Sequence, residues 1–264
     1  MCGIFGFLVD RDLTREDIEK GKKFTQQLSH RGPDNTGYWF QESEGIFLGH
    51  TRLSIIDLGV ESHQPFKFQN SMLVYNGEIY NYLEIKKELS EKGNAFKTNG
   101  DTEVLSSFLA TAQTNELKKL DGMFAFARYQ DQQLFLAIDL FGEKPLYWYK
   151  NSYGFYFSSE PSPLIEMLNL QFDESEEKKL MFNTLGYLNN GQTFYHGLHR
   201  MMPATAININ RNGDPKILKY WERPKFRFQD SNPIKLSGSE VDTIHEEISQ
   251  SLNVRTRSDV PMGI

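Results

Sequence analysis

The chain has 264 residues, 39% hydrophobic, 24% charged and 13% aromatic, which is enough to bury a core and unlike a disordered or fibrous protein. Its formal net charge of −6, without a long run of Lys or Arg, argues against nucleic acid as a partner. No apolar run approaches the ~20 residues of a membrane helix and the N-terminus does not resemble a secretory signal, so we expect no membrane partner.

The first part of the chain reads as a buried strand, a helix and a series of short strands. Gly3 to Val9 is apolar and β-rich, which predicts a strand buried on both faces with Cys2 at its start. Thr14 is a candidate cap for a helix from Glu16 to Leu28. Bounding Gly, Asp, Asn and Pro residues then predict one antiparallel sheet from strands 38–41, 46–50, 53–57 and 72–76.

The middle of the chain predicts two helices and a second sheet. Asn81 and Glu84 have the spacing of a capping box, for a helix that Gly93 closes. Another helix is predicted from Asp101 to Ala112. The strands predicted for the second sheet are 123–129, 133–139, 146–150 and 154–158, followed by a helix over 174–184 and a strand over 206–210.

The last part of the chain predicts a linker and one more helix. Residues 223–235 are polar and contain two prolines, which is typical of a linker. An apolar stripe then marks a helix over 239–257, through Val241, Ile244, Ile248 and Leu252. Few residues follow, so we expect that the helix either docks on the first domain or opens a domain of which the chain holds only the start.

Cys2 is the candidate nucleophile. A thiol is mostly protonated at neutral pH, but removal of Met1 would free an α-amine with a pKa of ~7.7–8.0 that could take the thiol proton. Taken alone, a buried Cys that behaves as a small hydrophobe is the more common situation. Because Cys2 is the only cysteine, no intramolecular disulfide can form, which favours a reducing compartment and a cytoplasmic location.

An ordered set of motifs resembles the class II glutamine amidotransferases. The set consists of Met1–Ile4, Arg31–Asp34, Gly49–Leu58 and Asn76–Asn81. Within that superfamily the chain resembles the glutamine-hydrolysing asparagine synthetases through further motifs, at 100–103, 122–126, 141–147 and 158–160. The resemblance runs to about Trp221 and resumes at 257–263, which is similar to the lead into the synthetase domain of that family.

The resemblance implies an α+β fold, a four-layer α/β/β/α N-terminal-nucleophile hydrolase sandwich of two antiparallel sheets. It implies a glutaminase domain over 1–222, a linker over 223–238 and the start of an ATP-dependent synthetase domain over 239–264. Cys2 would release ammonia from glutamine without a cofactor. ATP and Mg would be needed only in the synthetase domain, which makes asparagine from aspartate. A homodimer is one possible assembly.

The resemblance also assigns roles to residues of the site. Asn76 and Gly77 would stabilise the oxyanion, and Arg31 would support the nucleophile. Glutamine would be bound by Arg52, Leu53, Ile55, Glu78 and Asp101, with Arg52 on its carboxylate and Asp101, near Glu78, on its ammonium. The structural alternatives are a turn for Asn76–Gly77, a surface arginine for Arg52 and a helix N-cap for Asp101. The six histidines lack metal-ligand spacing, so no metal is expected.

Several positions depart from the family pattern. Ile138 and Leu140 stand where arginines flank the aspartate, Pro161 stands where a basic residue is common, and Gly100 replaces a serine. These changes question communication with the synthetase domain, or the identity of the acceptor, more than glutamine hydrolysis. Two alternatives are another carboxylate acceptor, such as a sugar acid of polysaccharide synthesis, and a non-catalytic scaffold. We expect this chain alone to hydrolyse glutamine without aspartate-dependent ATP consumption.

Overall fold

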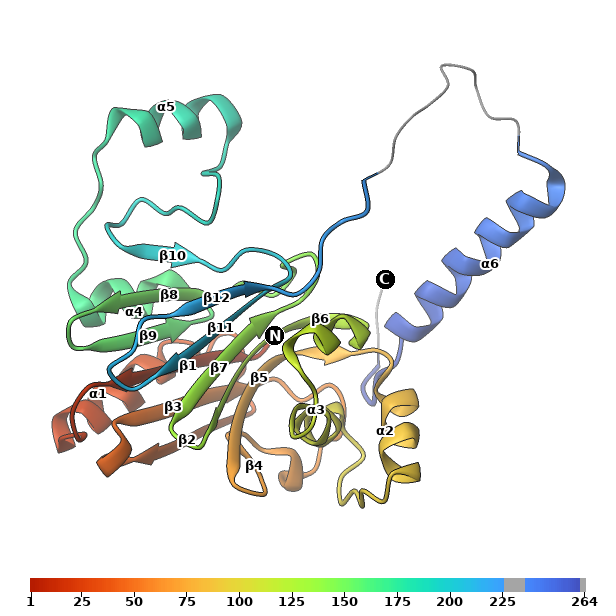
Figure 1. Cartoon of the computed structure of the whole chain (residues 1–264), viewed down its shortest axis with the longest axis horizontal. Coiled ribbons are helices and arrows are strands. Elements are labelled where there is room, and N and C mark those ends of the chain that lie inside the picture. Colours follow the sequence, from red (N-terminus) through yellow and green to blue (C-terminus); the bar gives the residue numbers. More distant parts are fainter. Residues whose placement is uncertain (226–235, 262–264) are drawn as a thin grey trace.

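The computed structural model describes residues 1–225 and 236–261, and within them the strands form two six-stranded antiparallel sheets. The sheets lie face to face (Figure 1). In spatial order the first sheet contains β10 (Leu198–Arg200), β8 (Tyr147–Asn151), β9 (Gly154–Ser158), β1 (Gly3–Val9), β3 (Ile46–Arg52) and β2 (Asn35–Gln41). The second contains β12 (Lys216–Lys219), β11 (Thr205–Asn210), β7 (Gln133–Ile138), β6 (Gly122–Gln130), β5 (Ser71–Ile79) and β4 (Phe66–Phe68).

The predicted division of strands between the sheets by chain order is wrong. β5 pairs with β6 in the second sheet, whereas β8 and β9 lie in the first. β1 pairs with β3 on one side and with β9 on the other. The β8–β9 hairpin, which comes late in the chain, therefore joins the sheet of the early strands. Strand periodicity identifies strands but carries no information on such distant partners.

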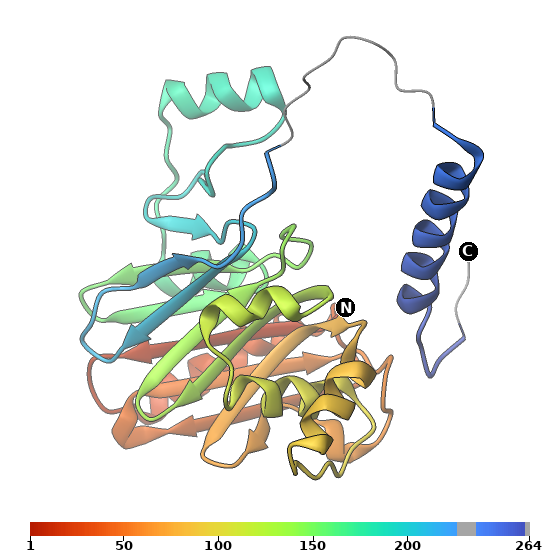
Figure 2. The ribbon, with the colours of Figure 1, turned by 45° about the vertical axis from the view of Figure 1, so that its right-hand side comes forward.

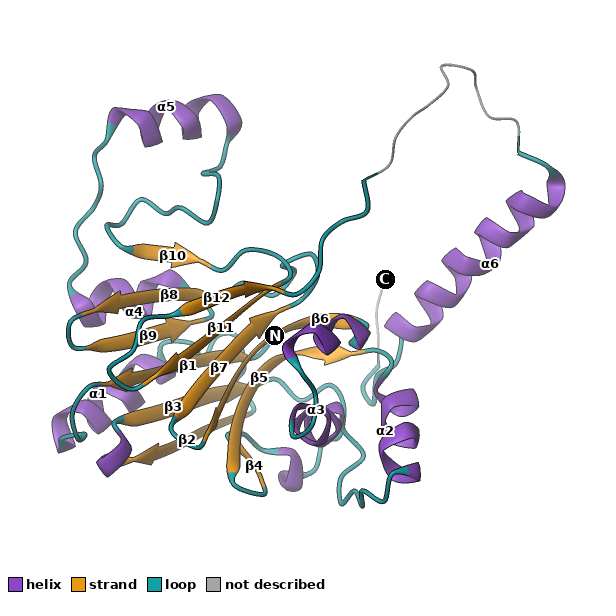
Figure 3. Ribbon diagram, viewed as in Figure 1, coloured by secondary structure: helices purple, strands orange, loops and turns teal. Residues whose placement is uncertain are grey.

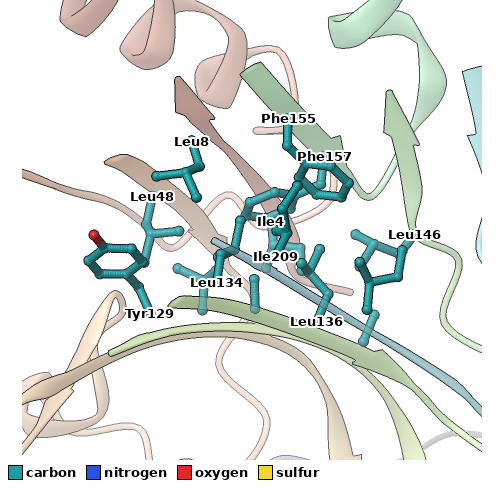
Figure 4. Packing of buried hydrophobic residues seen from close by; sticks show 14 of the residues in the cluster. Ile4, Leu8, Leu48, Tyr129, Leu134, Leu136, Leu146, Phe155, Phe157 and Ile209 are labelled. Atoms are coloured by element: carbon teal, nitrogen blue, oxygen red, sulfur yellow. The ribbon is translucent and has the colours of Figure 1, made fainter. Parts of the chain in front are cut away.

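The core between the sheets is built by alternate residues of the strands (Figure 4). In β1, Ile4 and Leu8 face the second sheet, while Phe5, Phe7 and Val9 face the helices on the other side. Alternation of side chains along a strand produces this division. A strand buried on both faces explains the continuous apolar run read from the sequence.

Helices form the two outer layers (Figure 3). α1 (Arg15–Gln26) and α4 (Pro161–Leu168) cover the first sheet, and α2 (Tyr82–Glu91) and α3 (Asp101–Leu109) lie on the second. Thr14 caps α1 through a capping box with Asp17, as its predicted role requires. The sequence did not predict α4, which begins at Pro161, a residue that suits the first position of a helix. The order of layers is α/β/β/α.

The strand predicted over Leu53–Asp57 is a loop. Its backbone donors bond to side chains instead of a neighbouring strand: Leu53 N–H points to Cys2 Sγ, and Ser54 N–H donates to Asp34. Asp57 adopts a left-handed backbone with a φ of 52°, which no regular strand contains. The apolar residues of this segment serve the cavity described below.

The capping box predicted for α2 is also absent. Asn81 stands at the N-cap, but its side chain accepts from Asp121 N–H and donates to the carbonyl of Lys119. Glu84 is instead paired with Arg257. Gly93 follows the helix with a φ of 92°, a backbone conformation that favours glycine at a helix end.

Two helices stand away from the sandwich (Figure 2). α5 (Glu176–Leu185) belongs to an arm beyond β10, and α6 (Gly238–Arg255) begins with a capping box between Ser237 and Glu240. The predicted stripe of α6 is 46–60% exposed, so α6 does not dock through it. Residues 226–235 of the predicted linker lie outside the described residues. Over the part of the chain that the structure describes, no helix combines the length and apolarity needed to cross a membrane.

Candidate active site

Cys2 lies immediately before β1 and faces a cavity that is partly open to solvent. Eight residues predicted for the site line this one cavity: Cys2, Arg52, Leu53, Ile55, Asn76, Gly77, Glu78 and Asp101. They come from both sheets, from the 53–59 loop and from the first turn of α3. The fold therefore brings together residues that are up to a hundred positions apart in the chain.

The thiol of Cys2 lies against the backbone of Leu53. Leu53 N is 3.4 Å from Sγ and the Leu53 carbonyl oxygen is 3.6 Å from it. Burial raises the pKa of the Cys2 thiol, while the Leu53 N–H and the nearby cationic groups act in the opposite direction. Because the resting thiol is protonated, it needs a base before it can attack.

The N-terminal amine lies in surroundings that suit a base. Burial lowers the pKa of the Met1 amine, and the positive charges of Arg31 and Lys144 lower it further. An amine with a lowered pKa is less protonated at neutral pH and can accept a proton. Removal of Met1 would free the backbone nitrogen of Cys2 as the new N-terminal amine.

Arg31 lies behind the nucleophile and holds its backbone. Its Nε donates to the Cys2 carbonyl at 3.0 Å, and its Nη1 donates to Glu160 at 2.8 Å. The turn after it is tied to β3, since Asp34 N–H donates to the Arg52 carbonyl and the Asp34 carboxylate accepts from Ser54 N–H. Arg31 contacts the Cys2 backbone without lining the cavity.

Asn76 and Gly77 lie near the end of β5. Asn76 is buried, and its amide nitrogen has no hydrogen-bond partner among the described residues although Asn76 lines the cavity. Such an unpaired buried donor is costly to fold unless it serves another purpose. Gly77 has no room for a side chain, because a Cβ there would lie 2.2 Å from the carbonyl oxygen of Met123 on β6. Close pairing of the two strands therefore requires a glycine at this position.

Arg52 is an internal residue, which rules out the surface alternative. Arg52 is only 4% exposed, and its guanidinium donates to the carbonyl of Gly59 at 2.9 Å and to the carbonyl of Asp57. These bonds use part of its five N–H groups and fix the plane of the guanidinium beside the cavity. A fixed, planar cation is suited to a carboxylate.

Asp101 is likewise not a helix N-cap, because Gly100 occupies that position. Its Oδ2 accepts from the hydroxyl of Tyr75 at 2.7 Å and from Ile79 N–H at 3.0 Å. Burial raises the pKa of Asp101, and the pKa of Glu78 is raised by burial and then by the charge of Asp101. The cavity thus holds a buried arginine and two mutually repelling carboxyl groups, an arrangement that complements a free amino acid.

Sequence reasoning missed Lys144, Tyr75, Gln64, Thr102 and Met123, which also line the cavity. Lys144 is only 6% exposed, and burial lowers the pKa of its amine. The loop that carries it is organised by Asp139, whose carboxylate accepts backbone N–H bonds from Phe124, Phe141, Glu143 and Lys144. Retention of Asp139 between two altered positions was the sequence signal for this loop.

His50 links the two sheets just behind the site. Its Nε2 lies 3.1 Å from the carbonyl of Tyr75, so Nε2 carries the proton. Within residues 1–225 and 236–261 no cluster of three or more His, Cys, Asp or Glu side chains is placed to hold a metal ion. His50 is a structural residue of the sandwich.

The burial of His50 predicts a pH dependence of stability. Burial lowers the pKa of His50 from 6.5 to about 3, so the unfolded chain takes up a proton below pH 6.5 that the folded protein refuses. The contribution of neutral His50 to the free energy of unfolding is therefore fully present above pH 6.5. It is lost as the pH falls from 6.5 to about 3, by at most ~1.4 kcal/mol per pH unit. We expect His50→Gln, measured by denaturant unfolding from pH 7 to 4.5, to flatten this slope. An unchanged slope would contradict the assignment.

Comparisons with known proteins identify the family of the chain. A family model described as "Glutamine amidotransferase domain" matches residues 1–221. Asparagine synthetase [glutamine-hydrolyzing] 1 of Bacillus subtilis is 34% identical over the whole chain, and putative asparagine synthetase [glutamine-hydrolyzing] 2 of Methanocaldococcus jannaschii is 28% identical over the whole chain. The chain spans only 41% and 54% of the lengths of these two relatives.

A solved structure supports the fold. Glutamine phosphoribosylpyrophosphate amidotransferase from Bacillus subtilis superposes with a TM-score of 0.60 and 22% identity, covering 84% of this chain and 50% of the other. The expected α+β architecture, a four-layer α/β/β/α sandwich of two antiparallel sheets and helices, is confirmed. With the family match over residues 1–221, the chain belongs to the glutamine amidotransferase domain family, class II, as found in glutamine-hydrolysing asparagine synthetases.

Proposed function

We propose that this domain hydrolyses the side-chain amide of free glutamine to glutamate and ammonia, with Cys2 as the nucleophile. The observation that carries the proposal is the content of one cavity: a thiol, an unpaired buried amide, a fixed arginine and two carboxyl groups. The first two groups suit attack on an amide, and the others suit an amino-acid zwitterion. A scaffold without chemistry has no need of this combination.

The proposed reaction begins after Met1 is removed. The α-amine of Cys2 takes the thiol proton, and the thiolate attacks the carbonyl carbon of the glutamine side chain. The resulting oxyanion accepts hydrogen bonds from the Asn76 amide and Gly77 N–H. Collapse of the tetrahedral intermediate breaks the C–N bond, and the protonated amine passes its proton to the departing ammonia. Water then attacks the thioester, which yields glutamate and restores the thiol.

Recognition of glutamine follows from the charges of the cavity. Arg52 would bind the α-carboxylate, and Asp101 with Glu78 would receive the α-ammonium. A bound ammonium would also offset the negative charge of Asp101, which, after burial, raises the pKa of Glu78. Leu53 and Ile55 would complete the binding wall of the 53–59 loop.

Substrate analogues test this recognition. We expect kcat/KM for N-acetylglutamine and for glutamine α-amide to be about 10- to 100-fold below that for glutamine, because each analogue lacks one charge-assisted contact. The measurement is glutamate or analogue acid released with time, with the Cys2→Ala protein as the blank. Equal hydrolysis of all three compounds would show that the cavity does not read the two charges.

The fate of the ammonia is a separate question, because the chain spans about half the length of these two relatives. We propose that a C-terminal synthetase domain uses ATP and Mg to activate aspartate, and that ammonia from this domain then forms asparagine. The names of the two relatives support this acceptor. A longer protein that consumes ATP with a different carboxylate, and not with aspartate, would redirect the proposal to another amide product. The cytoplasmic location stays a prediction.

A further inference from the structure

The chain after α6 returns to the sandwich and binds the outside of the 53–59 loop. We propose that Asp259 and Arg257 hold this loop in its glutamine-binding position, so that the segment after α6 sets the affinity of the domain for glutamine. The kinetic consequence rests on the proposed function. The structural part rests on hydrogen bonds between residues that lie about two hundred positions apart in the chain. Neither residue lines the cavity, so both act as positioning residues.

Asp259 contacts the loop through two hydrogen bonds. Its carboxylate accepts from Asp57 N–H at 2.7 Å, and its own N–H donates to the carbonyl of Ile55 at 3.0 Å. The first is a charge-assisted bond, the stronger kind. Together the two bonds fix the backbone on both sides of Ile56, at the wall of the cavity.

Asp57 connects this contact to the groups that would bind glutamine. Its carbonyl accepts from Arg52, the proposed partner of the carboxylate. Its side chain accepts from Asn99 N–H at 2.9 Å and from Gly100 N–H at 3.1 Å, directly before Asp101. Asp57 also holds a left-handed backbone, which a non-glycine residue keeps only when its surroundings impose it. Loss of the Asp259 contact would therefore loosen Arg52 and the start of α3 together.

Arg257 anchors the segment to the domain. Its guanidinium donates to the Tyr80 carbonyl and pairs with both oxygens of Glu84, at 3.1 and 3.3 Å. Arg255 lies 4.8 Å from the centre of the Tyr80 ring and 3.6 Å from Asp121. Because α6 leads directly into this segment, a displacement of α6 would pull Asp259 from Asp57.

The test is steady-state glutamine hydrolysis by the full chain carrying Asp259→Ala. We expect KM for glutamine to rise by about five- to twentyfold with kcat within twofold, because the loop must be reordered on binding while the reacting groups are untouched. Arg257→Ala should shift KM in the same direction. Asp259→Asn should recover most of the affinity, since its amide oxygen can still accept from Asp57 N–H. Asp242→Ala, an exposed acid on α6, is the matched control and should not change KM.

Hydrogen exchange separates failure of this inference from failure of the proposed function. Asp259→Ala should speed exchange of the Asp57 amide and leave β6 protected. A wild-type protein that hydrolyses glutamine, with KM within twofold in both alanine variants, would overturn the inference. If the wild type does not hydrolyse glutamine, the proposed function fails, and unchanged protection of the 53–59 loop in Asp259→Ala would overturn the inference as well.

Discussion

Glutamine hydrolysis is expected to fall by about 10⁴-fold or more in kcat when Cys2 is replaced by alanine, the order of loss seen when a catalytic nucleophile is removed. No other cysteine exists in the chain, so no second thiol can take over. Because Cys2 precedes β1 and lies at the cavity, its truncation should leave the sandwich folded. The measurement is glutamate release, with circular dichroism and the thermal midpoint as controls for folding.

The single thiol also makes the chemical control simple. Iodoacetamide should add one carboxamidomethyl group and abolish activity, and saturating glutamine should protect the thiol against it. The mass of the active protein should correspond to loss of Met1, because the proposed base is the α-amine of Cys2. Full activity in a preparation that retains Met1 would contradict this base, and an alanine variant that still hydrolyses glutamine would contradict the nucleophile.

Sequence reasoning predicted the elements that depend on local pattern. β1, with both faces buried, and α1, with its capping box, are encoded by neighbouring residues. The sheet to which β5 belongs was not predictable in this way, because its partner β6 begins more than forty residues later. Residues 53–57 were misread as a strand because their apolar side chains line the cavity. Their backbone N–H groups are bonded to the side chains of Cys2, Asp34 and Asp259 instead of to a neighbouring strand.

The candidate site could be predicted only in part for the same physical reason. Ordered motifs supplied the residues that the structure gathers around Cys2, and Arg31 behind it. Lys144 lies in the same cavity but depends on a loop that is folded around Asp139 by backbone hydrogen bonds. The contact between Asp57 and Asp259 joins two residues that share no sequence pattern.

The altered positions beside Asp139 can now be explained structurally. Ile138 is 1% exposed and packs between the sheets, and Leu140 packs on the helical side of the second sheet. Asp139 keeps its own four backbone bonds, so the loop before Lys144 does not need charged neighbours. These two apolar residues do not line the cavity, and they leave the loop around Asp139 in place.

Replacing Asn76 with alanine should lower kcat for glutamine by about 10²- to 10³-fold with little change in KM, because one oxyanion donor is worth roughly 3–4 kcal/mol in the transition state and little in the ground state. The folded protein should not be destabilised by a lost hydrogen bond, since the Asn76 amide nitrogen has no partner among the described residues. The measurement is glutamate release together with thermal unfolding.

Asn208→Ala is the matched control for this prediction. Asn208 lies on β11 of the same sheet, and its side-chain oxygen also lacks a hydrogen-bond partner within the described ranges, but it does not line the cavity. Its replacement should leave kcat within twofold. If Asn76→Ala instead raised KM at unchanged kcat, the amide would bind ground-state glutamine and another group would have to stabilise the oxyanion. Comparing kcat and KM of Asn76→Ala with those of the wild type thus distinguishes a role of the unpaired Asn76 amide in the transition state from a role in substrate binding.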